Sequence, residues 1–331
     1  MRLGIDIGGT FTDFVLIDDA SGEVHVEKCL TTPAQPDEAV FTGIDRLAER
    51  NRDLLARMKD VIHATTLVTN VIIERKGSKT GLITTKGFRD ILELRREDRY
   101  FLFDMFIRFP EPLVPRRLRL GVEERVLADG TELKPLAEQE VREAARLFRQ
   151  ENVGAVAVSF LHSYANPEHE KRVREILGEE LPGVPVSLSH EVHPEPREYE
   201  RTSTTVVDAY VKRITATYLD ELTKGIGKRG FRGRPYMMLS NGGTATIEAA
   251  KRFPVQILES GPAAGVEAAS FFARLMGIHT LLSFDMGGTT AKICFIADGR
   301  PEQSRKFEVA RIWRNLKGSG LPVRIPVTEM V

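Results

Sequence analysis

The sequence is poor in cysteine, has no excess of charge of either sign and contains no long apolar run. Its two cysteines, Cys29 and Cys294, provide neither a disulfide framework nor a zinc-binding spacing. The 47 lysines and arginines are balanced by 47 aspartates and glutamates, so neither nucleic acid nor an anionic membrane is indicated as a partner. No apolar run approaches the roughly 18 residues that a membrane helix needs. Residues 1–7 lead straight into an expected strand without the features of a signal peptide, so we expect a cytoplasmic protein.

Length and patterning indicate the fold class. The chain has 331 residues, of which 42% are hydrophobic, and this is enough for two domains with a large core. Short apolar runs such as 81–85 and 155–160 alternate with segments of helical periodicity such as 200–225. This alternation predicts an α/β fold.

One short motif occurs twice, with its copies 279 positions apart (285 − 6 = 279). The first copy runs from Asp6 to Asp13 and the second from Asp285 to Lys292, and in each a Gly-Gly-Thr run separates two apolar segments. Glycines let backbone N–H groups approach an anion, a threonine hydroxyl adds a hydrogen bond, and an aspartate can hold a hydrated divalent cation. Two such hairpins facing each other are expected to clamp a nucleotide polyphosphate.

The motif differs from the two commonest phosphate-binding loops. It lacks the Gly-Lys-Ser/Thr ending of a P-loop, and a strand rather than a helix follows it, unlike the dinucleotide fingerprint. A third segment, residues 258–265 (LESGPAAG), precedes the second copy. A loop followed by a helix start, with proline in the first turn, would explain it. It also resembles the connecting helix of the actin, sugar kinase and Hsp70 superfamily, which would place Glu259 near the γ-phosphate to orient the attacking nucleophile.

Several other polar residues are weaker candidates. Residues 63–70 (HATTLVTN) lie at an expected strand-to-helix junction, where a threonine can cap the helix. His63 and Asn70 are less easily explained as caps, so we predict that they, together with Asn241, contact the substrate. His190 and His193 lie close enough in sequence to form a metal pair, but their spacing matches no strong metal signature and a structural role is favoured.

In these motifs the sequence resembles the hydantoinase A/5-oxoprolinase family, which includes ATP-dependent N-methylhydantoinases and subunits of acetone and acetophenone carboxylases. The resemblance extends over the whole chain. The matching stretches are residues 4–13 (GIDIGGTFTD), 63–70, 74–77 (ERKG), 82–90 (LITTKGFRD), 160–164 (FLHSY), 166–167 (NP), 196–202 (PREYERT), 240–243 (SNGG), 260–263 (SGPA), 285–290 (DMGGTT) and 318–327 (GSGLPVRIPV).

The resemblance implies an ATP-dependent hydrolase of a cyclic amide, with hydantoin, N-methylhydantoin or 5-oxoproline as substrate. ATP would phosphorylate the ring carbonyl oxygen, and Mg²⁺ or Mn²⁺ would neutralise phosphate charge. Asp6 and Asp285 are the expected metal ligands, and Glu259, Asp285 and Asp6 are the expected catalytic residues. The expected phosphate-binding residues are Gly8, Gly9, Thr10, Thr12 and Asp13 on one side and Gly287, Gly288, Thr289 and Thr290 on the other.

The resemblance also implies an actin/sugar-kinase/Hsp70-like (ribonuclease H-like) fold of duplicated domains, the second incomplete. Residues 1–278 would form the N-terminal domain with the first phosphate loop and insertions, and residues 279–331 the truncated start of the second nucleotide-binding domain. Residues 321–331 read as a single strand in mid-course. Since family members are roughly twice this length, the chain is expected to be an N-terminal part or a truncated subunit. A hydantoinase B-type subunit is its expected partner.

Three alternatives remain open at the level of sequence. A carboxylase subunit of the same family would also use ATP to activate an oxygen atom, but on an enolate or bicarbonate. A non-catalytic scaffold would use the incomplete nucleotide domain for assembly with a larger partner. A small-molecule kinase of the same superfamily would leave a phosphorylated product without opening a ring.

Overall fold

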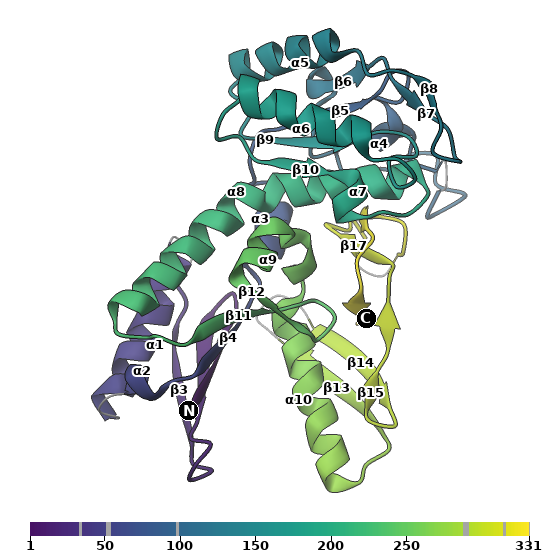
Figure 1. Ribbon diagram of the computed structural model, residues 1–331. Helices are drawn as coiled ribbons and strands as arrows, with labels where there is room; N and C mark the ends of the chain where they lie inside the picture. The colour runs from purple at the N-terminus through teal and green to yellow at the C-terminus, as the bar shows by residue number, and fades with distance from the viewer. Residues whose placement is uncertain (33–34, 51–53, 97–98, 287–290, 314–315, 331) are drawn as a thin grey trace. The chain divides into compact units, whose positions relative to one another are not determined.

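The computed structural model describes residues 1–32, 35–50, 54–96, 99–286, 291–313 and 316–330 (Figure 1). The chain divides into two compact units, each assembled from separate stretches of sequence. Unit 1 comprises Met1–Asn70, Thr215–Arg305 and Pro326–Val331, and unit 2 comprises Val71–Ile214 and Lys306–Ile325. The expected domain boundary at 278/279 therefore falls inside unit 1, where a helix before it and strands after it pack together.

Unit 1 is built on a six-stranded mixed sheet with the strand order β12-β11-β4-β1-β2-β3. Strand β4 is parallel to β1 and β11, whereas β2 is antiparallel to both β1 and β3. In β1 the buried side chains of Leu3, Ile5 and Ile7 alternate with more exposed ones, so Asp6 lies on the opposite face from them. The strands are β1 (Arg2–Ile7), β2 (Phe11–Ile17), β3 (Val24–Leu30), β4 (Asp60–Thr65), β11 (Arg234–Met238) and β12 (Thr244–Thr246).

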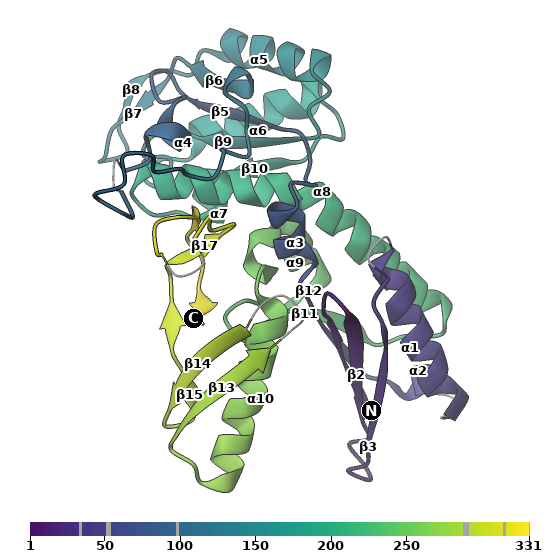
Figure 2. The same cartoon turned by 180° about the vertical axis from the view of Figure 1, so that it is seen from behind.

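Helices cover this sheet and link it to a second, smaller one. Helix α1 packs on β2 and β3, and the C-terminal half of α8 approaches α1 so closely that a Cβ atom on Gly225 would overlap the Phe41 ring (Figure 2). The helices that contribute to unit 1 are α1 (Pro36–Arg50), α2 (Leu54–Arg57), α3 (Leu67–Ile73), α8 (Glu198–Lys228), α9 (Ile247–Arg252), η2 (Pro254–Ile257) and α10 (Ser260–Met276).

Helix α10 packs against both sheets of unit 1. The smaller sheet has the order β13-β14-β15, formed by β13 (Thr280–Met286), β14 (Ala291–Ala297) and β15 (Arg300–Pro301). Val266 of α10 packs with Cys294 and Ile296 of β14, so Cys294 is a buried apolar residue. Strand β16 (Gln303–Ser304) pairs with β19 (Val327–Thr328) near the end of the chain.

Unit 2 contains a parallel four-stranded sheet in the order β10-β9-β5-β6. Its strands are β5 (Thr80–Thr85), β6 (Arg119–Val122), β9 (Ala155–Ser159) and β10 (Val186–Leu188). Every residue of β5 and β9 is buried, as expected of parallel strands that are covered on both faces. Helices α5 (Glu138–Gln150) and α6 (Glu168–Glu180) pack together on one face (Figure 1).

The remaining elements of unit 2 are short. They are α4 (Ile91–Leu94), η1 (Arg116–Leu118), α7 (Ser189–Val192), the hairpin of β7 (Arg125–Val126) with β8 (Glu132–Lys134), and the pair of β17 (Phe307–Val309) with β18 (Leu321–Val323). The N-terminal half of α8 completes the unit. Among the described residues, no helix is long and apolar enough to cross a membrane.

The prediction of a single strand over 321–331 was wrong. Residues 321–323 form β18 and pair with β17, whereas residues 327–328 form β19 and pair with β16. The intervening segment ends at Pro326, which has no backbone N–H to continue a ladder. The apolar pattern of the tail therefore serves two separate strand pairs.

Candidate functional site

The first glycine motif forms the turn between β1 and β2, as predicted. Gly8 donates its N–H to the Phe11 carbonyl at 2.9 Å, and Gly9 and Thr10 are exposed at the tip. Thr31 holds the turn, because its hydroxyl donates to the Gly8 carbonyl at 3.0 Å and its N–H donates to the Thr10 carbonyl at 2.9 Å. Within the part of the chain that the structure describes, the N–H groups of Gly9 and Thr10 donate to no acceptor. These two donors are therefore available to an anion.

Thr12 and Asp13 stabilise the hairpin behind this turn. The Thr12 side chain is fully buried, and its hydroxyl shares a 3.0 Å hydrogen bond with that of Thr31. Asp13 accepts an ion pair from Lys28 at 2.9 Å. In this arrangement Thr12 faces the interior, whereas Thr10 occupies the exposed position at the tip.

Asp6 lies at the end of β1, directly before the turn. Its Oδ1 atom is buried and has no hydrogen-bond partner among the described residues. Burial, followed by the charges of Asp13 and Asp285, raises the pKa of Asp6 to about 6. A Cβ atom on Gly261 would lie 2.9 Å from Asp6 Oδ1, so this glycine gives the carboxylate room beside the N-terminus of α10. A buried carboxylate oxygen without a donor is costly, and a hydrated cation would satisfy it.

The second glycine motif repeats the strand register of the first. Asp6 is the cross-strand partner of Asp13 in β1 and β2, and Asp285 is the cross-strand partner of Lys292 in β13 and β14. The duplication seen in the sequence is therefore also a duplication of local pairing. The predicted phosphate-binding residues between β13 and β14 lie outside the described residues, and they are Gly287, Gly288, Thr289 and Thr290.

Glu259 and Lys292 bring the third motif and the second hairpin together. Glu259 directly precedes α10, is almost fully buried, and its carboxylate forms an ion pair with the Lys292 ammonium group. Burial lowers the pKa of Lys292 to about 8. The charge of Asp285 also acts on Asp6. Four ionisable side chains from the three motifs therefore converge in unit 1, and they are Asp6, Asp285, Glu259 and Lys292.

The N-terminus of α10 is fixed by side chains from two strand ends. Ser260 donates its hydroxyl to the Thr65 carbonyl at 2.9 Å and accepts the Thr65 N–H at 3.0 Å. The Ser240 hydroxyl accepts the Glu259 N–H at 3.2 Å and donates to the Gln256 carbonyl at 2.7 Å. These contacts hold Glu259 and the first turn of α10 in place relative to the six-stranded sheet.

The three weak candidates for substrate contact occupy different environments. His63 is buried in β4, and its Nε2 atom shares a 2.6 Å hydrogen bond with the Tyr218 hydroxyl. This position does not fit the expected substrate contact, because Tyr218 and the surrounding core separate the ring from solvent. The Asn241 Oδ1 atom accepts the Gly243 N–H at 3.0 Å and so shapes its own turn. Asn70 is half-buried on α3.

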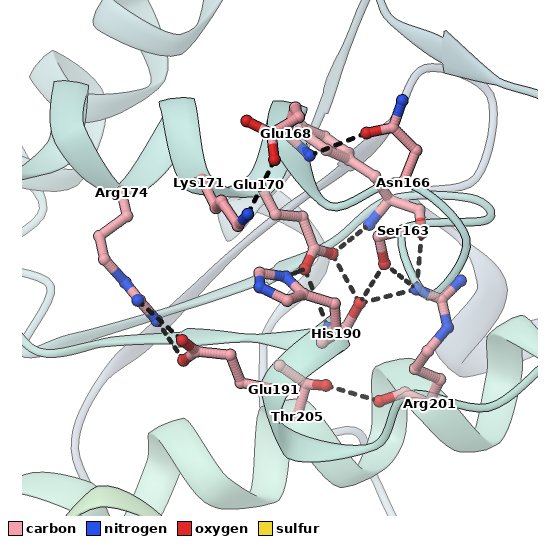
Figure 3. Close-up of polar contacts among 12 residues, drawn as sticks. Ser163, Asn166, Glu168, Glu170, Lys171, Arg174, His190, Glu191, Arg201 and Thr205 are labelled. Carbon is pink, nitrogen blue, oxygen red and sulfur yellow. Dashed lines mark hydrogen bonds and ion pairs between the residues drawn. The ribbon is translucent and has the colours of Figure 1, made fainter. Parts of the chain in front are cut away.

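A second group of buried polar side chains lies in unit 2, after the carboxyl ends of β9 and β10 (Figure 3). Glu170 accepts hydrogen bonds from His190 Nδ1 at 2.7 Å and from the Ser189 hydroxyl at 2.6 Å. Arg201 donates to the Ser189 hydroxyl at 2.7 Å. His190 is thus engaged by a carboxylate, in agreement with a structural role. Among the described residues, no group of three or more His, Cys, Asp or Glu side chains is arranged to hold a metal ion.

Sequence reasoning did not select Lys292 and Thr31 as site residues. The signal for Lys292 was present, because the repeat aligns it with Asp13 (13 + 279 = 292). Thr31 carries no local signal, since its role depends on the return of β3 beside the turn.

Two family models match most of the chain. The family model described as hydantoinase/oxoprolinase N-terminal region matches residues 2–181, and the hydantoinase/oxoprolinase model matches residues 201–331. An uncharacterised protein of Methanocaldococcus jannaschii is 42% identical, with 99% of this chain and 49% of that protein covered. The caprolactamase subunit alpha of Pseudomonas jessenii is 37% identical, with 94% of this chain and 45% of that protein covered.

A solved structure is similar over the full chain. The nucleotide-free structure of acetone carboxylase, from a study of ATP-dependent acetone carboxylation, superposes with a TM-score of 0.87 at 29% sequence identity. It covers 100% of this chain and 47% of that one. The chain thus spans about half the length of the curated relatives it matches.

Proposed function

The chain belongs to the hydantoinase/oxoprolinase family, and from this premise we propose that it is the nucleotide-binding part of an enzyme that hydrolyses a cyclic amide at the expense of ATP. The observation that carries the proposal is the convergence of Asp6, Asp285, Glu259 and Lys292 beside the turn formed by Gly8, Gly9 and Thr10. Carboxylates, a lysine and open backbone donors together suit a polyphosphate with its counter-cation.

The proposed reaction overcomes amide resonance, which makes a ring carbonyl a poor electrophile. The carbonyl oxygen of hydantoin, N-methylhydantoin or 5-oxoproline attacks the γ-phosphorus of ATP, and ADP leaves. Water then adds to the activated carbon, and the ring C–N bond breaks as the nitrogen takes up a proton. A second water hydrolyses the resulting acyl phosphate to the carboxylate and releases phosphate. Catalysis of the phosphoryl step is mostly positioning and neutralisation of charge.

Different residues carry out the positioning and the neutralisation of charge. The N–H groups of Gly9 and Thr10 bind phosphate oxygens from one side, and residues 287–290 of the second hairpin do so from the other. Lys292 keeps the Glu259 carboxylate in place at the start of α10, where it orients the attacking nucleophile. Lys292, charged in its ion pair with Glu259, also offers a cation to the phosphates.

Magnesium fits the residues that are present. Mg²⁺ is usually held by one or two carboxylates, with phosphate oxygens and waters completing its shell. Asp6 has an unpartnered buried oxygen, and Asp285 is exposed on β13 close enough to influence the charge of Asp6. Both would hold the ion, which when bound would neutralise charge on the phosphates.

The test is a calorimetric titration of the purified chain with Mg·ATP, followed by turnover assays on cyclic amides. Micromolar affinity that requires Mg²⁺, and that is lost in Asp6→Asn, is the expected result. The control variant Asp45→Asn has the same chemical change on the exposed face of α1 and should bind as the unmodified chain does. If Mg·ATP does not bind even when the B-type subunit is added, the proposal is contradicted and the non-catalytic scaffold is favoured.

A carboxylase subunit is the second candidate, and the structural similarity to acetone carboxylase favours it. The same nucleotide site would then activate an enolate or bicarbonate oxygen in place of an amide carbonyl. The two functions differ in their products. ATP-dependent release of a ring-opened amide supports the hydrolase, whereas incorporation of labelled bicarbonate into a ketone supports the carboxylase.

We also propose that the chain works in an assembly with a hydantoinase B-type subunit and has the actin-like duplicated fold. Three features support this. The matching relative from Pseudomonas jessenii is named as a subunit, and the two glycine hairpins have equivalent register. In addition, α10 and β13 expose large apolar side chains that further polypeptide would cover, among them Phe272, Leu275, Met276, Leu282 and Phe284.

A further inference from the structure

Unit 2 presents a short loop of large apolar side chains to solvent. Residues 101–106, which we call the aromatic loop, lie between α4 and η1. The exposed fractions of its apolar side chains are Phe101 52%, Leu102 75%, Phe103 91%, Met105 87% and Phe106 87%. Five such side chains in six residues are unusual on a soluble surface, where contiguous apolar patches generally mark interaction sites.

The base of the aromatic loop is held by specific contacts. The Tyr100 hydroxyl donates to the Arg108 carbonyl at 2.6 Å, and the Tyr100 ring meets the Phe109 ring edge-on with centroids 5.3 Å apart. The Arg95 guanidinium lies over the Phe109 ring at 4.1 Å and donates to the Pro110 carbonyl at 2.7 Å. These contacts join the chain segments on either side of the aromatic loop.

The tip also has an internal order. Asp104 accepts the Phe106 N–H on Oδ1 at 2.8 Å, and its carbonyl accepts a hydrogen bond from Arg99. These bonds turn the backbone so that Phe103, Met105 and Phe106 face outward. An organised loop that displays apolar side chains loses less entropy on binding than a disordered one.

We propose that the aromatic loop inserts into an apolar groove, bordered by carboxylates, on a second polypeptide subunit. This inference rests on the assembly with a B-type subunit proposed above. Phenylalanine, methionine and arginine are enriched at the centres of protein interfaces, where a few aromatic anchors carry most of the binding energy. Arg99 and Arg108 are exposed beside the anchors, and their charge complements an acidic rim.

The charges of the loop disfavour the other occupants. A lipid surface would have to accept Asp104 between Phe103 and Met105, and burying a carboxylate in acyl chains is costly. A symmetric contact between the aromatic loops of two copies would bring Arg99 and Arg108 close to the same arginines of the neighbour. A protein groove can satisfy Asp104 with a donor and the arginines with carboxylates.

Cysteine labelling tests the proposal directly. Cys29 and Cys294 are both buried, so Phe103→Cys introduces a single accessible thiol. The reaction rate of this thiol with a maleimide is measured in the full chain alone, at two protein concentrations, with the purified B-type subunit, and with vesicles containing an anionic phospholipid. Leu133→Cys, on the exposed β8 hairpin of the same unit, is the matched control.

The expected result is that the B-type subunit slows labelling at position 103 at least about tenfold and leaves position 133 unchanged. The triple variant Phe103→Ser, Met105→Ser, Phe106→Ser should weaken the complex at least about 100-fold, while Leu133→Ser should not. If the complex forms and position 103 stays reactive, the inference is wrong and the proposed assembly stands. If no complex forms, both fail. If vesicles or a higher protein concentration slow labelling at position 103, or if labelling there is already slow in the chain alone, the loop has a different occupant.

Discussion

Glu259 and Lys292 form an ion pair that joins the start of α10 to strand β14. Each residue belongs to a different sequence motif, and the pair brings both motifs to the carboxyl end of β1, where the Oδ1 atom of Asp6 is buried. Neither member is well exposed, so the pair contributes to stability only while both charges are present. The ion pair therefore affects both the stability of the chain and the position of the Glu259 carboxylate, and mutations can separate these two effects.

Lys292→Met should lower the free energy of unfolding by about 3 kcal/mol, because it leaves the Glu259 carboxylate buried without its partner. Adding Glu259→Gln should restore most of this stability, since the isolated charge is then removed. Urea denaturation of the two single variants and the double variant gives the coupling energy. A coupling below about 0.5 kcal/mol would contradict a close ion pair. Activity should remain low in all three variants if Glu259 positions the nucleophile.

Two glycines of α10 provide a matched pair of substitutions. Gly265→Ala meets no atom within 4 Å and should raise stability by about 0.5–1 kcal/mol, because alanine favours a helix over glycine. Gly261→Ala places a methyl group 2.9 Å from the original position of Asp6 Oδ1, so the carboxylate must move. We expect Gly261→Ala to fold but to bind Mg·ATP at least about tenfold more weakly than Gly265→Ala. Equal affinities in calorimetry would show that the position of Asp6 is not critical.

Local patterns allowed the turns and the repeat to be predicted, whereas long-range partners determined which side chains are buried. A Gly-Gly-Thr run between two apolar segments indicates a tight turn, and the register of Asp6 with Asp13 follows from that turn. His63 could not be placed in the same way. Its hydrogen-bond partner Tyr218 is 155 residues away on α8, and only the tertiary packing of that helix makes the histidine a core residue.

Asp6→Asn should raise the stability of the chain but weaken its binding of Mg·ATP. Burial raises the pKa of Asp6 to about 6 from an ordinary value of 3.8, so its carboxylate is charged at about pH 8. Keeping this charge in the folded chain costs up to about 3 kcal/mol of stability. The amide removes this cost, so the variant should be more stable than the unmodified chain at that pH. It should also bind Mg·ATP at least about 100-fold more weakly. Thermal unfolding and calorimetry on the same sample measure both effects, and a variant that is less stable and binds normally would contradict the assignment.

His63→Gln should alter how stability depends on pH. Burial lowers the pKa of His63 to about 4 from 6.5, so its neutral form contributes stability above about pH 6.5 that is lost as the pH falls towards 4. Asp6, whose pKa is raised, acts in the opposite direction, so the unmodified chain alone is not diagnostic. The informative quantity is the difference in unfolding free energy between the two chains. This difference should narrow by about 2.5 kcal/mol between about pH 7.5 and pH 4.5. A constant difference in urea denaturation would mean that His63 can be protonated in the folded chain.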